Sequence, residues 1–167
     1  MVLTPCQPQD CADFIALEQD PEVMRLLNGG RAFDRAWCTG GEDFLMPDGT
    51  ETCLWTARHK ADGAFVGWFC LWPDSATCAE LGYRLRRAEW GQGLASEGAR
   101  ALVQWGLQSG GYDRIFASTM TVNHASRRVM AKAGLAHVRT FHTTWPEPFP
   151  GTEEGLVEYE VRRSEAR

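Results

Sequence analysis

The sequence of 167 residues predicts one α+β domain, residues 1–167, built on a mixed, mostly antiparallel central sheet of about six to seven strands flanked by helices. Three observations lead to this prediction. Three β-type segments follow one another over residues 52–85, a strongly amphipathic helix separates them from a fourth, and two more β-type segments end the chain. A strand, a helix and a strand in that order indicate one parallel crossover in an otherwise antiparallel sheet.

The first 38 residues contain one strand pattern and three helix patterns. Residues 2–6 are typical of a strand, and residues 11–18 place apolar side chains at helical spacing. Asp20-Pro21-Glu22 then combines a capping residue, a proline and an acidic first turn, so it predicts the start of a short helix that Asn28-Gly29-Gly30 ends. Residues 32–38 carry a weaker helix pattern.

The middle of the chain changes to β-type spacing. Residues 52–59 and 65–72 predict a hairpin, in which Pro73-Asp74 stops the second strand. Residues 78–85 alternate, which predicts a third consecutive strand with two distinct faces. One face carries Leu81, Tyr83 and Leu85, and the other carries Glu80, Gly82 and Arg84.

The second half alternates between helices and strands. From Leu94 onward, apolar and small residues fall on one helical stripe that can lie on the sheet, until Gly110-Gly111 stops the helix. Asn123 is a typical cap for a second helix, which Gly134 closes. The strands predicted around these helices are residues 112–122, 135–144 and 156–163.

Composition excludes several classes of protein. Seventeen basic against 22 acidic side chains give a net charge of −5, which argues against nucleic-acid binding. No apolar run approaches the roughly 20 residues that span a bilayer, and residues 1–5 lack a basic and apolar leader pattern, so we expect a soluble, cytoplasmic protein with no membrane partner. The six cysteines form no CxxC pair and the four histidines complete no zinc pattern, so we expect buried thiols and no metal.

Residues 86–97 lead from the third strand through a glycine-containing loop into the amphipathic helix. Glycines let the backbone approach a ligand closely, and the free N–H groups of a helix's first turn bind an anion, so residues 90–96 are suited to a pyrophosphate. An ordinary turn also needs glycine. A Walker A loop is excluded because it needs a lysine, and a dinucleotide fingerprint is excluded because Asp113 begins the next strand instead of ending it.

Three motifs in order resemble the GNAT N-acetyltransferase superfamily, specifically its RimJ/RimL-type branch, over about residues 78–141. They are Glu80-Leu-Gly-Tyr-Arg-Leu85, Trp90-Gly-Gln-Gly-Leu-Ala-Ser-Glu97, and Asn123-His-Ala-Ser126 leading to Ala133-Gly134-Leu135. The family's loop, Gln/Arg-x-x-Gly-x-Gly/Ala, binds the pyrophosphate of acetyl-CoA and maps here onto Trp90-x-x-Gly93-x-Ala95. Trp90 replaces the usual Gln/Arg, so backbone groups must carry more of the binding.

The resemblance implies a sheet that is split to hold acetyl-CoA, with the pantetheine arm between the strand ending near Leu85 and the strand at residues 112–122. Exposed strand edges suit this amide-rich arm. The residues that we expect to bind the cofactor are Leu85, Trp90, Gly91, Gln92, Gly93, Leu94, Ala95, Ser96, Asn123 and Arg128. Arg127 and Arg128 could reach the 3′-phosphate or form an exposed helix face.

The reaction that the resemblance implies is attack of a neutral amine on a thioester, which needs a base for the amine and a donor for the leaving sulfur. Glu80 is the candidate base, acting through water; a solvated glutamate or an ion pair with an arginine is the alternative. Asn123 matches the family asparagine at the pantetheine, and a plain helix cap also explains it. Ser126 is suited to donate to the thiolate, or to bond its own backbone.

Other side chains near these motifs have weaker assignments. Tyr83 points away from Glu80 and is expected to line the core or the cleft. His124 is available as a proton carrier, but a histidine in a helix's first turn is usually solvated. The tryptophans assigned to an acceptor pocket are Trp37, Trp68, Trp72 and Trp145.

The leading functional prediction is acetyl-CoA-dependent N-acetylation of a primary amine, either a protein N-terminus or a small molecule. A non-catalytic acyl-CoA-binding or sensing module is the alternative from another class, and a nucleotide-binding protein is the third. Family members are often dimers, so the resemblance also points to a homodimer as one oligomeric state.

Overall fold

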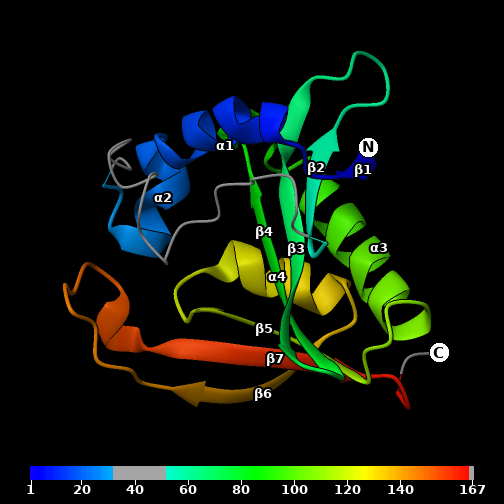
Figure 1. The fold of residues 1–167 in the computed structure, drawn as a ribbon. Coiled ribbons are helices and arrows are strands. Elements are labelled where there is room, and N and C mark those ends of the chain that lie inside the picture. The colour runs from blue at the N-terminus through cyan, green and yellow to red at the C-terminus, as the bar shows by residue number, and fades with distance from the viewer. Residues whose placement is uncertain (32–51, 166–167) are drawn as a thin grey trace.

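The computed structural model describes residues 1–31 and 52–165. Their strands form one sheet of seven strands in the order β1-β2-β3-β4-β5-β7-β6 (Figure 1). Only the pair β4 and β5 is parallel among the pairs of this sheet, which confirms the predicted mixed, mostly antiparallel sheet with one crossover. The strands are β1 (Val2–Pro5), β2 (Leu54–Arg58), β3 (Phe65–Ser75), β4 (Cys78–Leu85), β5 (Arg114–Met120), β6 (Ala136–Phe141) and β7 (Leu156–Arg162).

Helices begin and end where the capping residues predict. The Asp20 carboxylate accepts the Glu22 N–H at the start of α2, and Gly29 ends that helix in the left-handed region at φ 75°. The helix predicted at residues 32–38 lies outside the described residues. The four α-helices of the described chain are α1 (Cys11–Glu18), α2 (Pro21–Asn28), α3 (Leu94–Gln108) and α4 (His124–Lys132). None of them is long and apolar enough to cross a bilayer.

Two hydrophobic cores lie on opposite faces of the sheet. The larger packs α3 and α4 against the sheet around Phe69, Leu71 and Ile115, all of which are fully buried. The smaller packs α1 against β2 and β3 around Phe14 and Trp68. Helices therefore cover both faces of the β2–β4 half.

The alternation of β4 assigns its side chains to these two faces, as predicted. Leu81, Tyr83 and Leu85 belong to the core under α3 and α4. Glu80 and Arg84 therefore lie on the other face, the one that α1 covers. Whatever chemistry Glu80 supplies acts on the α1 side of the sheet.

The prediction that Pro73-Asp74 ends the preceding strand is wrong, because β3 continues to Ser75 and Pro73 pairs with Ala79. The Leu71 N–H donates to the Cys53 carbonyl on the β2 side. Two residues later the proline nitrogen faces that same side, so its missing N–H breaks no bond to β4. A bulge between Pro73 and Ser75 follows.

The sheet opens between its two halves. Pairing between β4 and β5 runs only from Cys78↔Arg114 to Glu80↔Phe116, after which the strands diverge. Figure 1 shows β3 and β4 running away from β5 and β7, with α4 behind the opening. The second half of β4 consequently has no strand partner on its β5 side among the described residues.

Candidate active site

A cavity of about 710 Å³ occupies the opening of the sheet. It is lined by β3 and β4 on one side, β5 on the other, the N-terminus of α3 and one face of α4, and α2 above. Of the predicted site residues, those that line it are Glu80, Leu85, Trp90, Gly91, Gly93, Leu94, Ala95, Ser96, Asn123, Ser126 and Arg128. Segments that are far apart in the chain therefore meet around one space.

The glycine loop ends in an array of free amides at one end of the cavity. Gly91 and Gly93 adopt φ of 76° and 82°, values that favour glycine, and Gly93 is the N-cap of α3. The first N–H bonded within the helix is that of Glu97, to the Gly93 carbonyl, so the N–H groups of the preceding first turn face outward. No heavy atom lies within 4 Å of a Cβ built on Gly93, which leaves room for an anion.

Gln92 is the predicted site residue that does not line the cavity. Its side-chain Nε2 donates to the Ala88 carbonyl at 2.9 Å and is exposed. The short helix before it (Arg87–Glu89) and this bond hold the loop in place. We therefore assign the Gln92 side chain to the loop's own structure.

Trp90 is half-exposed and attaches the loop to the sheet. Its indole Nε1 donates to the Leu85 carbonyl at 2.9 Å, at the end of β4. Leu85 is the last residue of β4, and its carbonyl faces the opening. Because this carbonyl accepts the Trp90 indole N–H, it is not available to a ligand. A tryptophan in this position thus orders the loop instead of supplying a cationic group to an anion.

Main-chain groups line both walls of the opening. The Arg86 N–H donates to the Val66 carbonyl on the β3 side, so by alternation the main-chain groups of Tyr83 face the opening, as does the Leu81 carbonyl beyond the last β4–β5 pair. On the opposite wall, Thr121 bonds to Gly155 on the β7 side, which turns the main chain of Ser118 toward the opening. An extended chain rich in amides fits between two such edges.

Two cationic side chains of α4 belong to the wall of the cavity. Arg128 and Lys132 are four residues apart, so they lie on one face of the helix, and both line the cavity. Lys132 is not among the residues predicted from the sequence, although its i, i+4 spacing from Arg128 is a sequence pattern. Arg127 does not line the cavity: its guanidinium donates to the Thr121 carbonyl at 3.1 Å and to the Tyr159 hydroxyl. His124 is exposed and does not line the cavity.

Asn123 and Ser126 form the start of α4 beside the opening. The Asn123 Oδ1 accepts the Ser126 N–H at 3.1 Å, which is the bond of a helix cap, and Asn123 Nδ2 donates to the Thr119 hydroxyl at 3.1 Å. The Oδ1 end of this amide therefore acts as the helix cap, while the Nδ2 end attaches the start of α4 to β5. The Ser126 hydroxyl lies 2.8 Å from the Tyr83 hydroxyl, and burial raises the pKa of Tyr83 to about 12.

Glu80 is partly buried on the α1 side of the sheet, where its register partner on β3 is Trp72. Within residues 1–31 and 52–165, no residue gives its carboxylate a hydrogen bond or an ion pair, so the ion-pair alternative has no support there. Burial raises the pKa of Glu80, and the negative charges of Asp74 and Glu158 raise it further. A carboxylate in this setting is a stronger base than an exposed glutamate.

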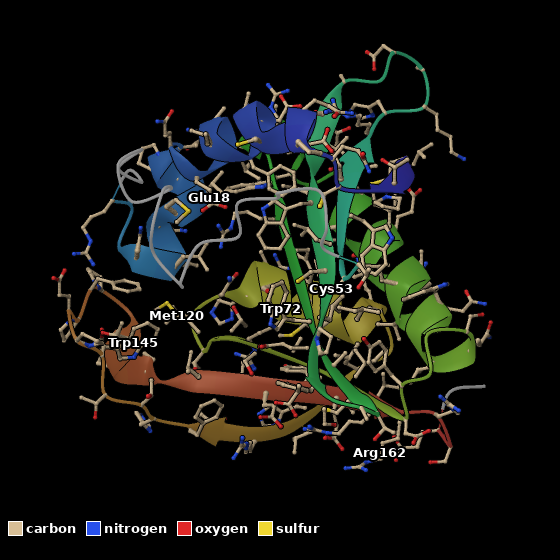
Figure 2. The ribbon with its side chains drawn as sticks, in the orientation of Figure 1. Glu18, Cys53, Trp72, Met120, Trp145 and Arg162 are labelled. Carbon is tan, nitrogen blue, oxygen red and sulfur yellow. The ribbon has the colours of Figure 1, made fainter. Side chains whose placement is uncertain are left out.

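Two of the predicted tryptophans lie at the cavity. Trp68 and Trp72 line it, and Arg84 lies over the Trp68 ring at 5.1 Å while forming an ion pair with buried Glu18. Figure 2 shows Trp72 near the middle of the molecule, where the two halves of the sheet diverge.

Trp145 does not line the cavity, which corrects its assignment to the acceptor pocket. It stacks edge-on with Phe149 in a separate hollow of the β6–β7 loop, at the left edge of Figure 2. That loop meets the end of α2, because a Cβ built on Gly29 would lie 2.9 Å from the Phe149 Cβ, and because Arg31 pairs with Glu147. We call α2 and this loop the rim. Trp37 lies outside the described residues.

Comparison with protein families gives a match to the acetyltransferase (GNAT) domain over residues 1–136. Among characterised proteins, FsC-acetyl coenzyme A-N(2)-transacetylase from Aspergillus fumigatus is 39% identical over 159 residues, covering 89% of this chain and 68% of the relative. The chain therefore shares both sequence and a comparable span with an acetyl-coenzyme-A-dependent transacetylase.

Solved structures of low sequence identity show the same fold. An acetyltransferase of the GNAT family from Bacillus anthracis superposes with a TM-score of 0.76 at 20% identity, covering 98% of this chain and 95% of that one. RimL, the ribosomal L7/L12 alpha-N-protein acetyltransferase in complex with coenzyme A, superposes with a TM-score of 0.76 at 14% identity, covering 96% and 92%. These two likenesses concern the fold alone.

Proposed function

The chain belongs to the GNAT acetyltransferase family, and from this premise we propose that it transfers the acetyl group of acetyl-CoA to a primary amine of a small molecule. Attack is direct, with both substrates bound at once. The observation that carries the proposal is the continuous cavity: it leads from the amides at the start of α3, between two strand edges, to the carboxylate of Glu80.

The residues of this chain divide the binding of acetyl-CoA among them. The amides at the start of α3 receive the pyrophosphate, and Arg128 and Lys132 add positive charge beside it. The main-chain groups of Leu81, Tyr83 and Ser118 receive the amides of the pantetheine arm. This arrangement supports a thioester placed near the start of α4, where Ser126 lines the cavity.

Glu80 removes the proton of the attacking amine, directly or through a water molecule. Its raised pKa brings the carboxylate closer to the pKa of an amine, which improves proton transfer near neutral pH. The Ser126 hydroxyl donates to the sulfur as the carbon–sulfur bond breaks. Holding amine and thioester in one cavity supplies the remaining acceleration through proximity.

The acceptor end favours an amine that arrives as a cation. The exposed Trp72 ring and the Glu80 carboxylate are register partners on one face of the sheet, and an aromatic face beside a carboxylate attracts an ammonium group. The relative named as an N(2)-transacetylase supports a nitrogen atom as the acceptor. A RimJ/RimL-type activity on a protein N-terminus is the second candidate, favoured by the likeness to RimL.

Calorimetry and a thiol-release assay test the proposal together. We expect micromolar binding of acetyl-CoA, and release of free coenzyme A in the presence of a panel of small primary amines and N-terminal peptides. Binding with no turnover for any acceptor would favour a sensing module. Stabilisation by ATP or NAD without any by coenzyme A would contradict the loop assignment.

A further inference from the structure

One phenol makes two hydrogen bonds to one residue at the edge of the cavity. The Tyr83 hydroxyl lies 2.8 Å from the Ser126 Oγ and 3.1 Å from the Ser126 carbonyl oxygen. Tyr83 comes from β4 and Ser126 from the first turn of α4, 43 residues later. The bonds therefore join the two elements that enclose the opening of the sheet.

Ser126 is held at three polar atoms in consequence. The Asn123 side chain fixes its N–H, and the Tyr83 hydroxyl contacts both its carbonyl and its hydroxyl. Tyr83 itself is fixed by its ring, which packs against Phe69 with centroids 6.1 Å apart. A serine in a helix's first turn normally rotates freely, so this restraint exceeds what helix capping requires.

The phenol has one proton and two acceptors within reach. When Tyr83 donates to the Ser126 carbonyl, its oxygen is available to accept the serine O–H, which then points at the phenol and is not available to a ligand. When Tyr83 donates to the Ser126 Oγ, the serine O–H is free to point into the cavity. A change between these arrangements moves two hydrogens and no heavy atom.

We propose that Tyr83 is a positioning residue that holds the Ser126 hydroxyl as the hydrogen-bond donor to the leaving sulfur. The inference rests on the proposed acetyl transfer. Negative charge on the sulfur selects the second arrangement, in which Tyr83 donates to Oγ and the serine donates to sulfur. Each bond in this chain strengthens the next.

The step balances without transfer of the phenolic proton. The carbon–sulfur bond breaks, its electron pair goes to sulfur, and a carbon–nitrogen bond forms, while the amine proton leaves through Glu80. Burial raises the pKa of Tyr83 to about 12, so the phenol stays protonated throughout and acts as a donor rather than as an acid. Ser126 likewise keeps its proton and stabilises the thiolate by a hydrogen bond.

Tyr83→Phe tests the inference, because the ring and its packing remain. We expect kcat to fall about tenfold with little change in the Kd of acetyl-CoA. We also expect the thiol of bound coenzyme A, titrated by the ultraviolet absorbance of its thiolate, to have a higher pKa in the variant than in the parent protein. A purely structural role for Tyr83 would leave that thiol pKa unchanged.

Ser126→Ala and the double variant show whether Tyr83 acts through the serine. We expect Tyr83→Phe to add nothing to Ser126→Ala, in kcat and in the thiol pKa. Tyr112→Phe is the matched control: it removes a phenol that packs against the same core but does not line the cavity. Its kcat should equal that of the parent.

Three results would overturn the inference. An additive loss in the double variant would mean that Tyr83 acts elsewhere, an unchanged thiol pKa would remove the hydrogen bond to sulfur, and an equal loss in Tyr112→Phe would indicate a general effect of core tyrosines. Failure of the parent protein to bind coenzyme A or to acetylate any amine would remove the proposed function itself. That result is distinguishable, because the inference alone predicts a difference between variants of an active protein.

Discussion

The two ends of the cavity are built in different ways. The loop end is contiguous: residues 90–96 present main-chain amides, and the glycines among them leave space for a ligand. The Glu80 end is assembled from side chains of the β3–β4 hairpin and of α2, two segments that are distant in sequence. A main-chain site suits a ligand that never changes, whereas a side-chain site can change with each substrate.

The charges of the cavity also differ between the loop end and the Glu80 end. In the proposed arrangement, free amides, Arg128 and Lys132 add positive charge at the loop end, and Glu80 and Asp74 add negative charge at the other. The lining arginines Arg25 and Arg84 are paired with Glu22 and Glu18. Opposite charge at the two ends orients a polyanionic donor and a cationic acceptor without a shared contact. A substitution at one end of the cavity should therefore leave ligand binding at the other end nearly unchanged. Four variants test this independence.

Gly93→Glu should have the largest effect. A side chain at φ 82° strains the loop and places a carboxylate where the amides receive an anion, so the Kd of coenzyme A should rise at least about 100-fold by calorimetry. Gly111→Glu is the matched control, since Gly111 has φ 83° and open space but lies outside the cavity. Equal loss of affinity in both variants would show that strain, not the site, is responsible.

Glu80→Gln should lower kcat/KM about 100-fold and leave the Kd of acetyl-CoA unchanged. Because the pKa of Glu80 is raised, its carboxylate is protonated at higher pH than an ordinary glutamate, and kcat/KM of the parent protein should fall as the pH drops through that raised pKa. The variant should lose this acid limb. Exposed Glu154→Gln is the control, and an acid limb retained in Glu80→Gln would identify a different base.

Lys132→Ala should raise the Kd of coenzyme A by roughly tenfold, with a smaller salt dependence than the parent shows. In the proposed arrangement this cation contacts the coenzyme and not the amine, so the KM of the amine should not move. Lys60→Ala, an exposed lysine in the turn after β2, serves as the control for net charge. A changed amine KM would show that the two ends are coupled.

Asp74→Asn should have the smallest effect. Removing one negative charge near Glu80 lowers the pKa of Glu80, so the acid limb of the kcat/KM profile should shift to lower pH while its maximum changes little. Asp62→Asn in the β2–β3 turn is the charge-matched control. A shift to higher pH would contradict the assignment of that limb to Glu80.

The loop end of the cavity, residues 90–96, was predictable from the sequence. The Glu80 end was predictable only in part. Alternation in β4, the glycine loop and the Asn123 cap are local patterns, and each appears in the structure where the pattern places it. The position of β7 between β5 and β6 was not predictable, because strand order depends on which edges pair and leaves no local signature.

The side chains that were predicted wrongly or not at all also depend on tertiary packing, which leaves no local pattern in the sequence. Trp145 was assigned to the acceptor pocket from its residue type, but the path of the β6–β7 loop decides where it packs. Lys132 was overlooked because a helix has several polar faces, and only the packing of α4 shows which one meets the cavity. Pro73 was taken as a strand end because the side on which its nitrogen lies depends on register.

The rim has a practical consequence for redesign. Its two parts meet through Gly29 and Phe149 and through the Arg31–Glu147 pair, all remote from the amides at α3. Grafting α2 and the β6–β7 loop as a matched pair should retarget the scaffold to new amines while the donor machinery stays untouched. Swapping either half alone would lose the contacts by which the two parts fit each other.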